Sequence, residues 1–135
     1  MLNENHITEI LADYFKSNDY RILTKLTTTQ KGIDLIVKDK QGVSIYVEIK
    51  GETSATVTSK RYGKPFNRNQ ITNHVGRALL ATFKAINTHT LESDKFAIAF
   101  PDTNGHELVL MNIKSVLDKL NITIYLVSNA GVRIL

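Results

Sequence analysis

Two neighbouring segments, Ile33–Lys38 and Val43–Lys50, alternate apolar and polar residues and are joined by a short loop that contains Gly42. Alternation with a period of two, interrupted by a glycine-containing turn, is typical of a β-hairpin. One set of alternate positions is entirely apolar and predicts a hairpin face that packs into a core. Its members are Ile33, Leu35, Val37, Val43, Ile45, Val47 and Ile49.

The register of this hairpin determines which polar residues meet on its other face. A three-residue loop after Asp39 pairs that residue with Val43. Counting outward from this pair places Asp34 directly opposite Glu48. Lys50 lies two residues beyond Glu48, so its side chain points to the same side of the strand.

Two carboxylates directly opposite each other repel and weaken a strand pair unless a cation lies between them. A hard divalent ion such as Mg²⁺, which binds one or two carboxylates together with water, meets that need. Charged outer residues are also ordinary on a solvated strand, so the hairpin alone leaves a metal site and a solvated face both open.

The sequences G-I-D, which ends at Asp34, and V-E-I-K-G, which contains Glu48 and Lys50, resemble the motif of the PD-(D/E)xK superfamily of metal-dependent nucleases. That motif has an Asp at the start of the second strand and a Glu-x-Lys in the third, and the three residues match these positions one for one. The proline that commonly precedes the Asp is absent, since Ile33 stands there.

The resemblance implies an α/β fold with a restriction endonuclease-like core, in which the elements follow the order α-β-β-β-α-β and a mixed central sheet is flanked by helices. It also implies an endodeoxyribonuclease that hydrolyses DNA phosphodiester bonds with Mg²⁺ or Mn²⁺. In the roles that the family assigns, Asp34, Glu48 and the main-chain carbonyl of Ile49 hold the metal. Lys50 orients the attacking water or neutralises charge that develops on the phosphorane.

Length and composition limit the class of protein. The 135 residues are 42% hydrophobic, which predicts one compact domain spanning residues 1–135. The net charge of +4 favours a polyanionic partner such as nucleic acid. The absence of cysteine excludes disulfides and thiolate metal sites. No 18-residue apolar run and no charged-then-apolar leader occurs, so we expect a cytoplasmic protein with no membrane partner.

The segment Asn3–Ser17 has apolar residues at helical spacing, and Tyr20–Thr27 is rich in β-forming residues, so we expect a helix and then a first strand. In superfamily members that resemble Holliday-junction resolvases, a glutamate of the first helix reaches toward the metal. Its distance along the chain from the aromatic residue of the next strand is similar to the distance from Glu9 to Tyr20. Glu9 is therefore the expected auxiliary catalytic residue, with a solvated helix carboxylate as an equal alternative. Glu4 is the weaker candidate because it lies near the helix end, which frays.

The segment Gly51–Asn69 is long, basic and poor in apolar residues, which is typical of a functional or mobile loop. Aromatic residues lie among its cations, a mixture that suits DNA phosphates and unstacked bases. A solvated loop is the alternative, but a position just after the Glu-x-Lys strand would place this segment over the site. The residues predicted to bind nucleic acid here are Lys60, Arg61, Tyr62, Lys64 and Arg68.

A second helix is predicted over Asn67–Asn87, and one of its faces carries Gln70, His74 and Arg77 at three- and four-residue intervals. Related nucleases often have a Gln or a basic residue early in this helix, close to the metal and the scissile phosphate, and Gln70 resembles that position. His74 and Arg77 either contact the DNA backbone or form a solvated face. The predicted buried stripe consists of Ile71, Val75, Ala78, Leu79, Phe83 and Ile86.

The remaining chain predicts a strand–helix–strand unit, which makes a parallel strand pair, and a last short strand. The elements are the strand Lys95–Phe100, the helix Asn104–Leu120 and the strands Ile122–Val127 and Val132–Leu135. The expected core residues of this helix are Leu108, Met111, Val116, Leu117 and Leu120. His89 and His106 lie in polar segments without a ligand-spaced partner, so both are expected at the surface.

Three interpretations of function follow from these residues. The first is a metal-dependent endonuclease. The second is a non-catalytic or partner-dependent nuclease-fold factor that binds DNA, for example in excision of a mobile element. The third is a structural domain in which Lys50 neutralises Asp34 and Glu48. Two-fold dimers are common among nucleases that cut both strands, so a homodimer is also expected.

Overall fold

The computed structural model describes residues 1–27, 32–52, 65–89 and 91–135. Its elements are α1 (Glu4–Ser17), β1 (Arg21–Lys25), β2 (Leu35–Lys38), β3 (Ser44–Ile49), α2 (Arg68–Thr88), β4 (Lys95–Pro101), α3 (Asn104–Met111), α4 (Lys114–Lys119), β5 (Ile122–Ser128) and β6 (Gly131–Ile134). The predicted order of a helix, three strands, a helix and a strand is found in the first six of these elements. Within the described ranges, no helix combines the length and the apolar character needed to cross a membrane.

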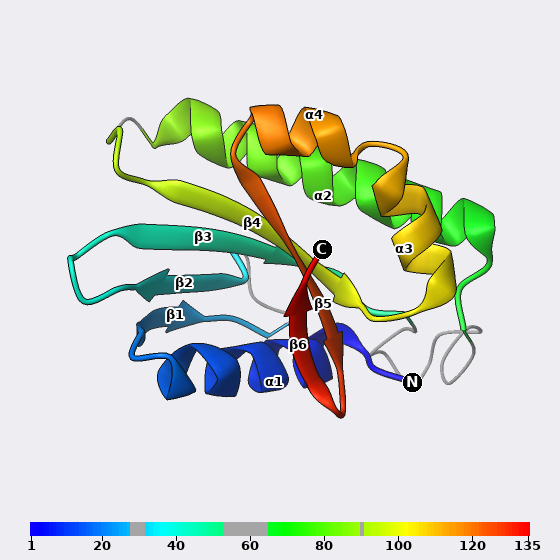
Figure 1. Ribbon diagram of the computed structural model, residues 1–135, viewed down its shortest axis with the longest axis horizontal. Coiled ribbons are helices and arrows are strands. Elements are labelled where there is room, and N and C mark those ends of the chain that lie inside the picture. The colour runs from blue at the N-terminus through cyan, green and yellow to red at the C-terminus, as the bar shows by residue number, and fades with distance from the viewer. Residues whose placement is uncertain (28–31, 53–64, 90) are drawn as a thin grey trace.

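The six described strands form one mixed sheet in the order β1-β2-β3-β4-β5-β6. Strands β1, β2 and β3 make an antiparallel meander, β4 and β5 continue parallel to β3, and β6 returns antiparallel to β5. Figure 1 shows α1 against one face of the sheet and α2, α3 and α4 against the other. The protein therefore has the expected α/β architecture, with a mixed sheet flanked by helices.

The β2–β3 hairpin has the predicted register. Leu35 pairs with Val47, and the main-chain N–H of Asp39 donates to the carbonyl of Val43 over 2.9 Å. Gly42 has a φ of 85°, the left-handed conformation that a three-residue loop requires at this point. Asp34 and Glu48 are each one residue beyond the Leu35–Val47 pair, so these two residues of the predicted site lie opposite each other.

The two faces of the sheet bury separate hydrophobic clusters. The face toward α1 buries the odd-numbered hairpin residues Leu35, Val37, Ile45, Val47 and Ile49, with Ile7, Leu11 and Phe15 of the helix. The face toward α2, α3 and α4 buries Ile98, Phe100, Ile122, Ile124 and Leu126, with Ile71, Val75, Ala78, Leu110 and Leu117. Even-numbered hairpin residues therefore point to the α2 side.

Ile33 departs from the predicted alternation. It lines a small cavity on the α2 side together with Tyr46 and Glu48. The reason is that β2 begins only at Leu35, after Gly32 has turned the chain with a φ of 129°. The period of two therefore does not extend to Ile33.

Helices α1 and α2 both begin with an asparagine capping box. Asn3 Oδ1 accepts the N–H of His6 at 3.0 Å, and Asn3 donates its own N–H to the His6 ring at 3.4 Å. Asn67 and Gln70 make the same reciprocal pair, with both bonds at 2.9 Å. These caps satisfy N–H groups that a helix leaves unpaired, so both N-termini are well defined.

Gly51 lies just beyond β3 and packs against the first turn of α1. A Cβ at this position would lie 2.7 Å from the main-chain nitrogen of Glu4 and 2.8 Å from the carbonyl carbon of Asn3. The main chain of Leu2 donates to Glu52 Oε1 at 2.8 Å, and Glu52 donates its N–H to the Leu2 carbonyl at 2.9 Å. The end of β3 and the start of α1 are therefore held in direct contact.

Gly51→Ala is expected to lower the free energy of unfolding by about 1–3 kcal/mol, because the neighbouring atoms are main chain and cannot yield easily. Gly76→Ala in α2, where nothing lies within 4 Å of the added methyl, is the control and should raise it by about 0.5–1 kcal/mol. Urea denaturation of the two variants measures both changes. An unchanged stability in Gly51→Ala would contradict the close approach.

The predicted helix Asn104–Leu120 is interrupted at Asn112 and Ile113, which separates α3 from α4. The interruption changes which residues face the sheet, so Leu110 and Leu117 are buried. The predicted core was otherwise wrong for this unit, because Leu108, Met111, Val116 and Leu120 are 47–56% exposed. Phe83 and Ile86 of α2 are likewise exposed.

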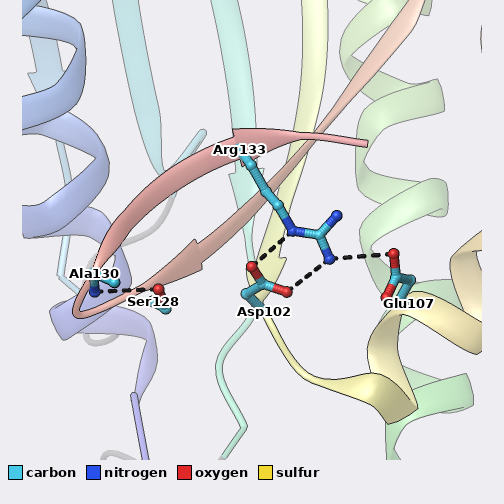
Figure 2. Close-up of polar contacts among 5 residues, drawn as sticks. All are labelled: Asp102, Glu107, Ser128, Ala130 and Arg133. Atoms are coloured by element: carbon cyan, nitrogen blue, oxygen red, sulfur yellow. Dashed lines mark hydrogen bonds and ion pairs between the residues drawn. The ribbon is translucent and has the colours of Figure 1, made fainter.

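Arg133 ties the edge strand β6 to the end of β4 and to α3 (Figure 2). Its Nε and Nη2 each donate to an oxygen of Asp102 over 2.8 Å, and Nη2 lies 3.2 Å from Glu107 Oε1. This bidentate contact holds the pKa of the Asp102 carboxyl below its usual range. The network fixes the path of β6 across the sheet.

Candidate active site

Asp34 and Glu48 meet at the end of the β2–β3 hairpin. Asp34 Oδ2 accepts the main-chain N–H of Ile49 over 2.8 Å, and the Asp34 and Glu48 side chains are hydrogen-bonded to each other. Burial and then the charge of Asp34 raise the pKa of Glu48 to about 8, and burial raises the pKa of Asp34. Both shifts favour retention of a proton by the pair toward neutral pH.

Lys50 and Glu4 extend this pair into a cluster of four charged side chains. Lys50 Nζ lies 3.7 Å from Glu48 Oε1 and 4.0 Å from Glu4 Oε1. The side chains of Lys50 and Glu4 are only 18% and 28% exposed. Burial raises the pKa of the Glu4 carboxyl, the charge of Lys50 opposes this shift, and the charge of Asp34 adds to it. The first turn of α1 therefore contributes a third carboxyl to the site.

Glu9 is not brought to this cluster, so its expected position beside the metal is corrected. Its carboxylate pairs with Lys25 of β1 at 2.9 Å, and its side chain is 62% exposed. The reason is that the first turn of α1 is held against the end of β3 by the Asn3 cap and the close approach of Gly51. Glu4, the weaker candidate on the sequence, occupies the position expected of Glu9.

Helix α2 presents His74 to the same region. The His74 ring is half-buried, with its centroid 4.5 Å from that of Phe66. Burial, followed by the charges of Lys50 and Arg77, lowers the pKa of the imidazole. His74 is therefore neutral at physiological pH and lies near the site lysine, whereas Arg77 is exposed to solvent.

Two more predicted residues lie at the N-terminus of α2. Gln70 is half-buried, and its Oε1 accepts the N–H of Asn67 in the capping box. Arg68 is the first helical residue and is exposed. The other residues predicted to bind nucleic acid lie outside the described ranges: Lys60, Arg61, Tyr62 and Lys64.

Of the two histidines expected at the surface, His106 is buried and His89 is half-buried. His106 is 1% exposed, and its Nδ1 lies 2.7 Å from Thr103 Oγ1. His89 is half-buried and stacks on Tyr46, with ring centroids 4.1 Å apart. The signal that could have located His106 is the spacing T-x-x-H, since Thr103 caps α3 by accepting the His106 N–H.

The donor set suits a divalent cation. Asp34 and Glu48 supply carboxylates, and the Ile49 carbonyl points to the same side of β3 as the N–H that Asp34 binds. Mg²⁺ in proteins commonly takes one or two carboxylates and completes its shell with water and phosphate oxygens. In the part of the chain that the structure describes, no group of three or more His, Cys, Asp or Glu side chains is arranged to hold a metal ion. A cation here would therefore be bound by the two carboxylates and the carbonyl.

Comparison with protein-family models, with curated proteins and with solved structures finds no match for this chain. What the protein does must therefore be inferred from the four charged residues that meet at the end of β3, which are Glu4, Asp34, Glu48 and Lys50.

Proposed function

We propose that the protein is a metal-dependent endodeoxyribonuclease of the PD-(D/E)xK kind, with a restriction endonuclease-like core. The opposed and partly buried pair of Asp34 and Glu48, with Lys50 Nζ 3.7 Å from Glu48 Oε1, is the observation that carries the proposal. Carboxyl groups that are partly buried and opposed to each other cost stability, and such groups with raised pKa values concentrate at functional sites. The succession of a helix, a three-stranded meander, a helix and a strand around this pair supports the same assignment.

Each residue of the cluster has a role in this proposal. Asp34 and Glu48, with the Ile49 carbonyl, would hold Mg²⁺ or Mn²⁺ once the shared proton has left. Bound there, the ion would supply Lewis-acid stabilisation of the phosphate and a more acidic attacking water. Lys50 orients that water or neutralises charge on the phosphorane, and Glu4 positions the Lys50 ammonium. Gln70 would be an auxiliary catalytic residue, and Arg68 and the basic segment would add affinity for the DNA backbone.

Glu4→Gln is expected to lower the rate of DNA cleavage about tenfold or more, because residues that orient a catalytic group contribute effects of this size. Glu9→Gln in the same helix is the matched control, and its rate should stay within about twofold of the unchanged protein, since Glu9 pairs with Lys25 instead. Single-turnover cleavage of supercoiled plasmid measures both rates. Equal cleavage rates of the two variants would show that Glu4 has no role in catalysis.

A second candidate function is a DNA-binding accessory factor, such as one used in mobile-element excision, that does not cut or cuts only with a partner. The charge balance of the pair without metal favours it, since burial and the charge of Asp34 raise the pKa of Glu48 and Lys50 lies 3.7 Å from its carboxyl. Such an arrangement does not require a metal ion to balance its charge.

Incubation of supercoiled plasmid and of a four-way junction with Mg²⁺ or Mn²⁺ separates these functions. Metal-dependent nicking or resolution by the isolated chain is the expected result and would also show which DNA is preferred. Metal binding in a calorimeter without cleavage would favour the accessory factor. Neither binding nor cleavage would mean that the carboxylate pair is structural.

A further inference from the structure

Two buried histidine nitrogens have no hydrogen-bond partner among the described residues: Nδ1 of His74 in α2 and Nε2 of His106 in α3. The helices α2 and α3 pack against each other. Beside these two residues the helices approach closely, since a Cβ at Gly105, next to His106, would lie 2.9 Å from Ile71 Cδ1, one turn before His74. Burial and then the charge of His74 lower the pKa of His106 to about 4. A buried polar atom without a partner is costly, so two such atoms on facing helices point to a partner that they share.

Thr103 determines where His106 carries its proton. Thr103 Oγ1 accepts the main-chain N–H of His106 at 3.1 Å and lies 2.7 Å from its Nδ1. The hydroxyl proton is then free to donate to Nδ1, and the 2.7 Å separation suits a hydroxyl donor. With the hydroxyl as the donor, the ring proton of His106 is on Nε2, the buried nitrogen that needs an acceptor.

We propose that His106 Nε2–H is linked through one buried water to Nδ1 of His74, and that this link fixes His74 as an Nε2–H donor to a phosphate of bound DNA. The water accepts from His106 and donates to His74, which satisfies a donor on one ring and an acceptor on the other. Thr103 and His106 are positioning residues, because they reach DNA only through His74. This inference rests on the proposed function in one respect, because that function identifies the phosphate as part of DNA.

The surroundings of His74 suit this role. Its Nδ1 is fully buried while the ring as a whole is half-buried, so the exposed part of the ring is elsewhere. The Phe66 ring, 4.5 Å away, restricts rotation of the imidazole. A neutral imidazole N–H can bind a phosphate oxygen without placing a second cation beside Lys50.

The positions of the ring protons can be read by ¹⁵N NMR of the imidazoles in the full chain, without DNA, near neutral pH. Both rings are expected as Nε2–H tautomers, with the His74 Nδ1 resonance shifted as that of a hydrogen-bond acceptor. His106→Leu should displace this resonance, and His106→Gln, whose amide N–H can replace Nε2–H, should restore it. A proton on Nδ1 of either ring would overturn the link, whatever the protein does with DNA.

Affinity for a short labelled duplex in EDTA tests the contact with phosphate. His74→Ala should weaken binding about tenfold, as expected for the loss of one hydrogen bond to a charged group. His106→Leu should weaken it by a smaller factor while the melting temperature stays equal or rises, because leucine replaces an imidazole nitrogen that lacks a protein partner. His106→Gln should restore the affinity.

A merely structural role of His106 predicts the reverse for His106→Leu, a lower melting temperature with unchanged DNA affinity. Unchanged affinity in His74→Ala would overturn the phosphate contact. If the unchanged protein bound no DNA, the phosphate contact and the proposed function would both fail. The tautomers would still decide whether the link between the two histidines exists.

Discussion

Glu48→Gln is expected to abolish metal-dependent DNA cleavage, with a loss of about 10³-fold or more, and to leave DNA affinity equal or higher. Glutamine keeps the shape of the side chain and can still donate a hydrogen bond to Asp34, so the fold should be retained. It cannot ionise, and the cation loses one of its two carboxylates. Affinity should not fall, because the substitution removes a negative charge from the path of the phosphate backbone.

The comparison is single-turnover cleavage together with DNA binding, measured for Glu48→Gln, Asp34→Asn and a control. Glu92→Gln is a suitable control, because Glu92 is exposed and lies just before β4, at the end of the sheet opposite to Lys50. The two site variants should lose cleavage alike, and the control should lose neither property. Loss of DNA binding in the site variants, or retained cleavage, would contradict the metal-binding role of the pair.

The metal-free protein is expected to lose stability as the pH rises from about 6.5 to about 8, and Mg²⁺ should restore it. The pKa of Glu48 is about 8 in the folded protein and near its ordinary 4.5 in the unfolded chain. Within this interval the folded state binds more protons than the unfolded state, so the free energy of unfolding falls as pH rises. Each unit of difference between the two pKa values contributes about 1.4 kcal/mol.

The lower limit of this pH window is set by the histidines. The pKa of His106 is lowered from 6.5 to about 4 by burial and by His74, so between these values stability rises with pH and opposes the effect of Glu48. Above 6.5 this opposition ends. Urea denaturation across the window, with and without Mg²⁺, should show a slope that Glu48→Gln removes. The same slope in that variant would show that another group is responsible.

The hairpin could be predicted in detail because its constraints are local. A period of two assigns each residue to a face, and the length of the loop then fixes which residues are paired. The placement of Asp34 opposite Glu48 followed from these two rules alone, and the observed register agrees with it. Lys50 followed from Glu48 by the same alternation.

The contribution of α1 could not be predicted, because the helix pattern does not say which turn meets the end of β3. Glu9 lies in the middle of α1, whereas the position of Glu4 depends on an Asn3 cap and on contact with Gly51. The cap is visible in the sequence only as the residue type of Asn3. The contact with Gly51 joins segments about fifty residues apart, which no local pattern reveals.

The C-terminal helical unit was mispredicted for a related reason. A continuous helix over residues 104–120 was inferred from spacing, but the interruption at Asn112 and Ile113 rotates the second half relative to the first. The burial of His106 was missed for a different reason, because it depends on the packing of α3 on the sheet and against α2. Polar character alone placed this histidine at the surface.

The reciprocal hydrogen bonds between Leu2 and Glu52 make the start of α1 and the end of β3 a single cooperative unit. Helix ends open locally at a small fraction of the cost of global unfolding. Opening of this one turn would withdraw Glu4 from Lys50 while the sheet stays intact. The amide protons of residues 2–8 should therefore exchange with solvent through this local opening, and their protection measures how often the four-residue cluster is complete. Binding of DNA or metal should slow that exchange.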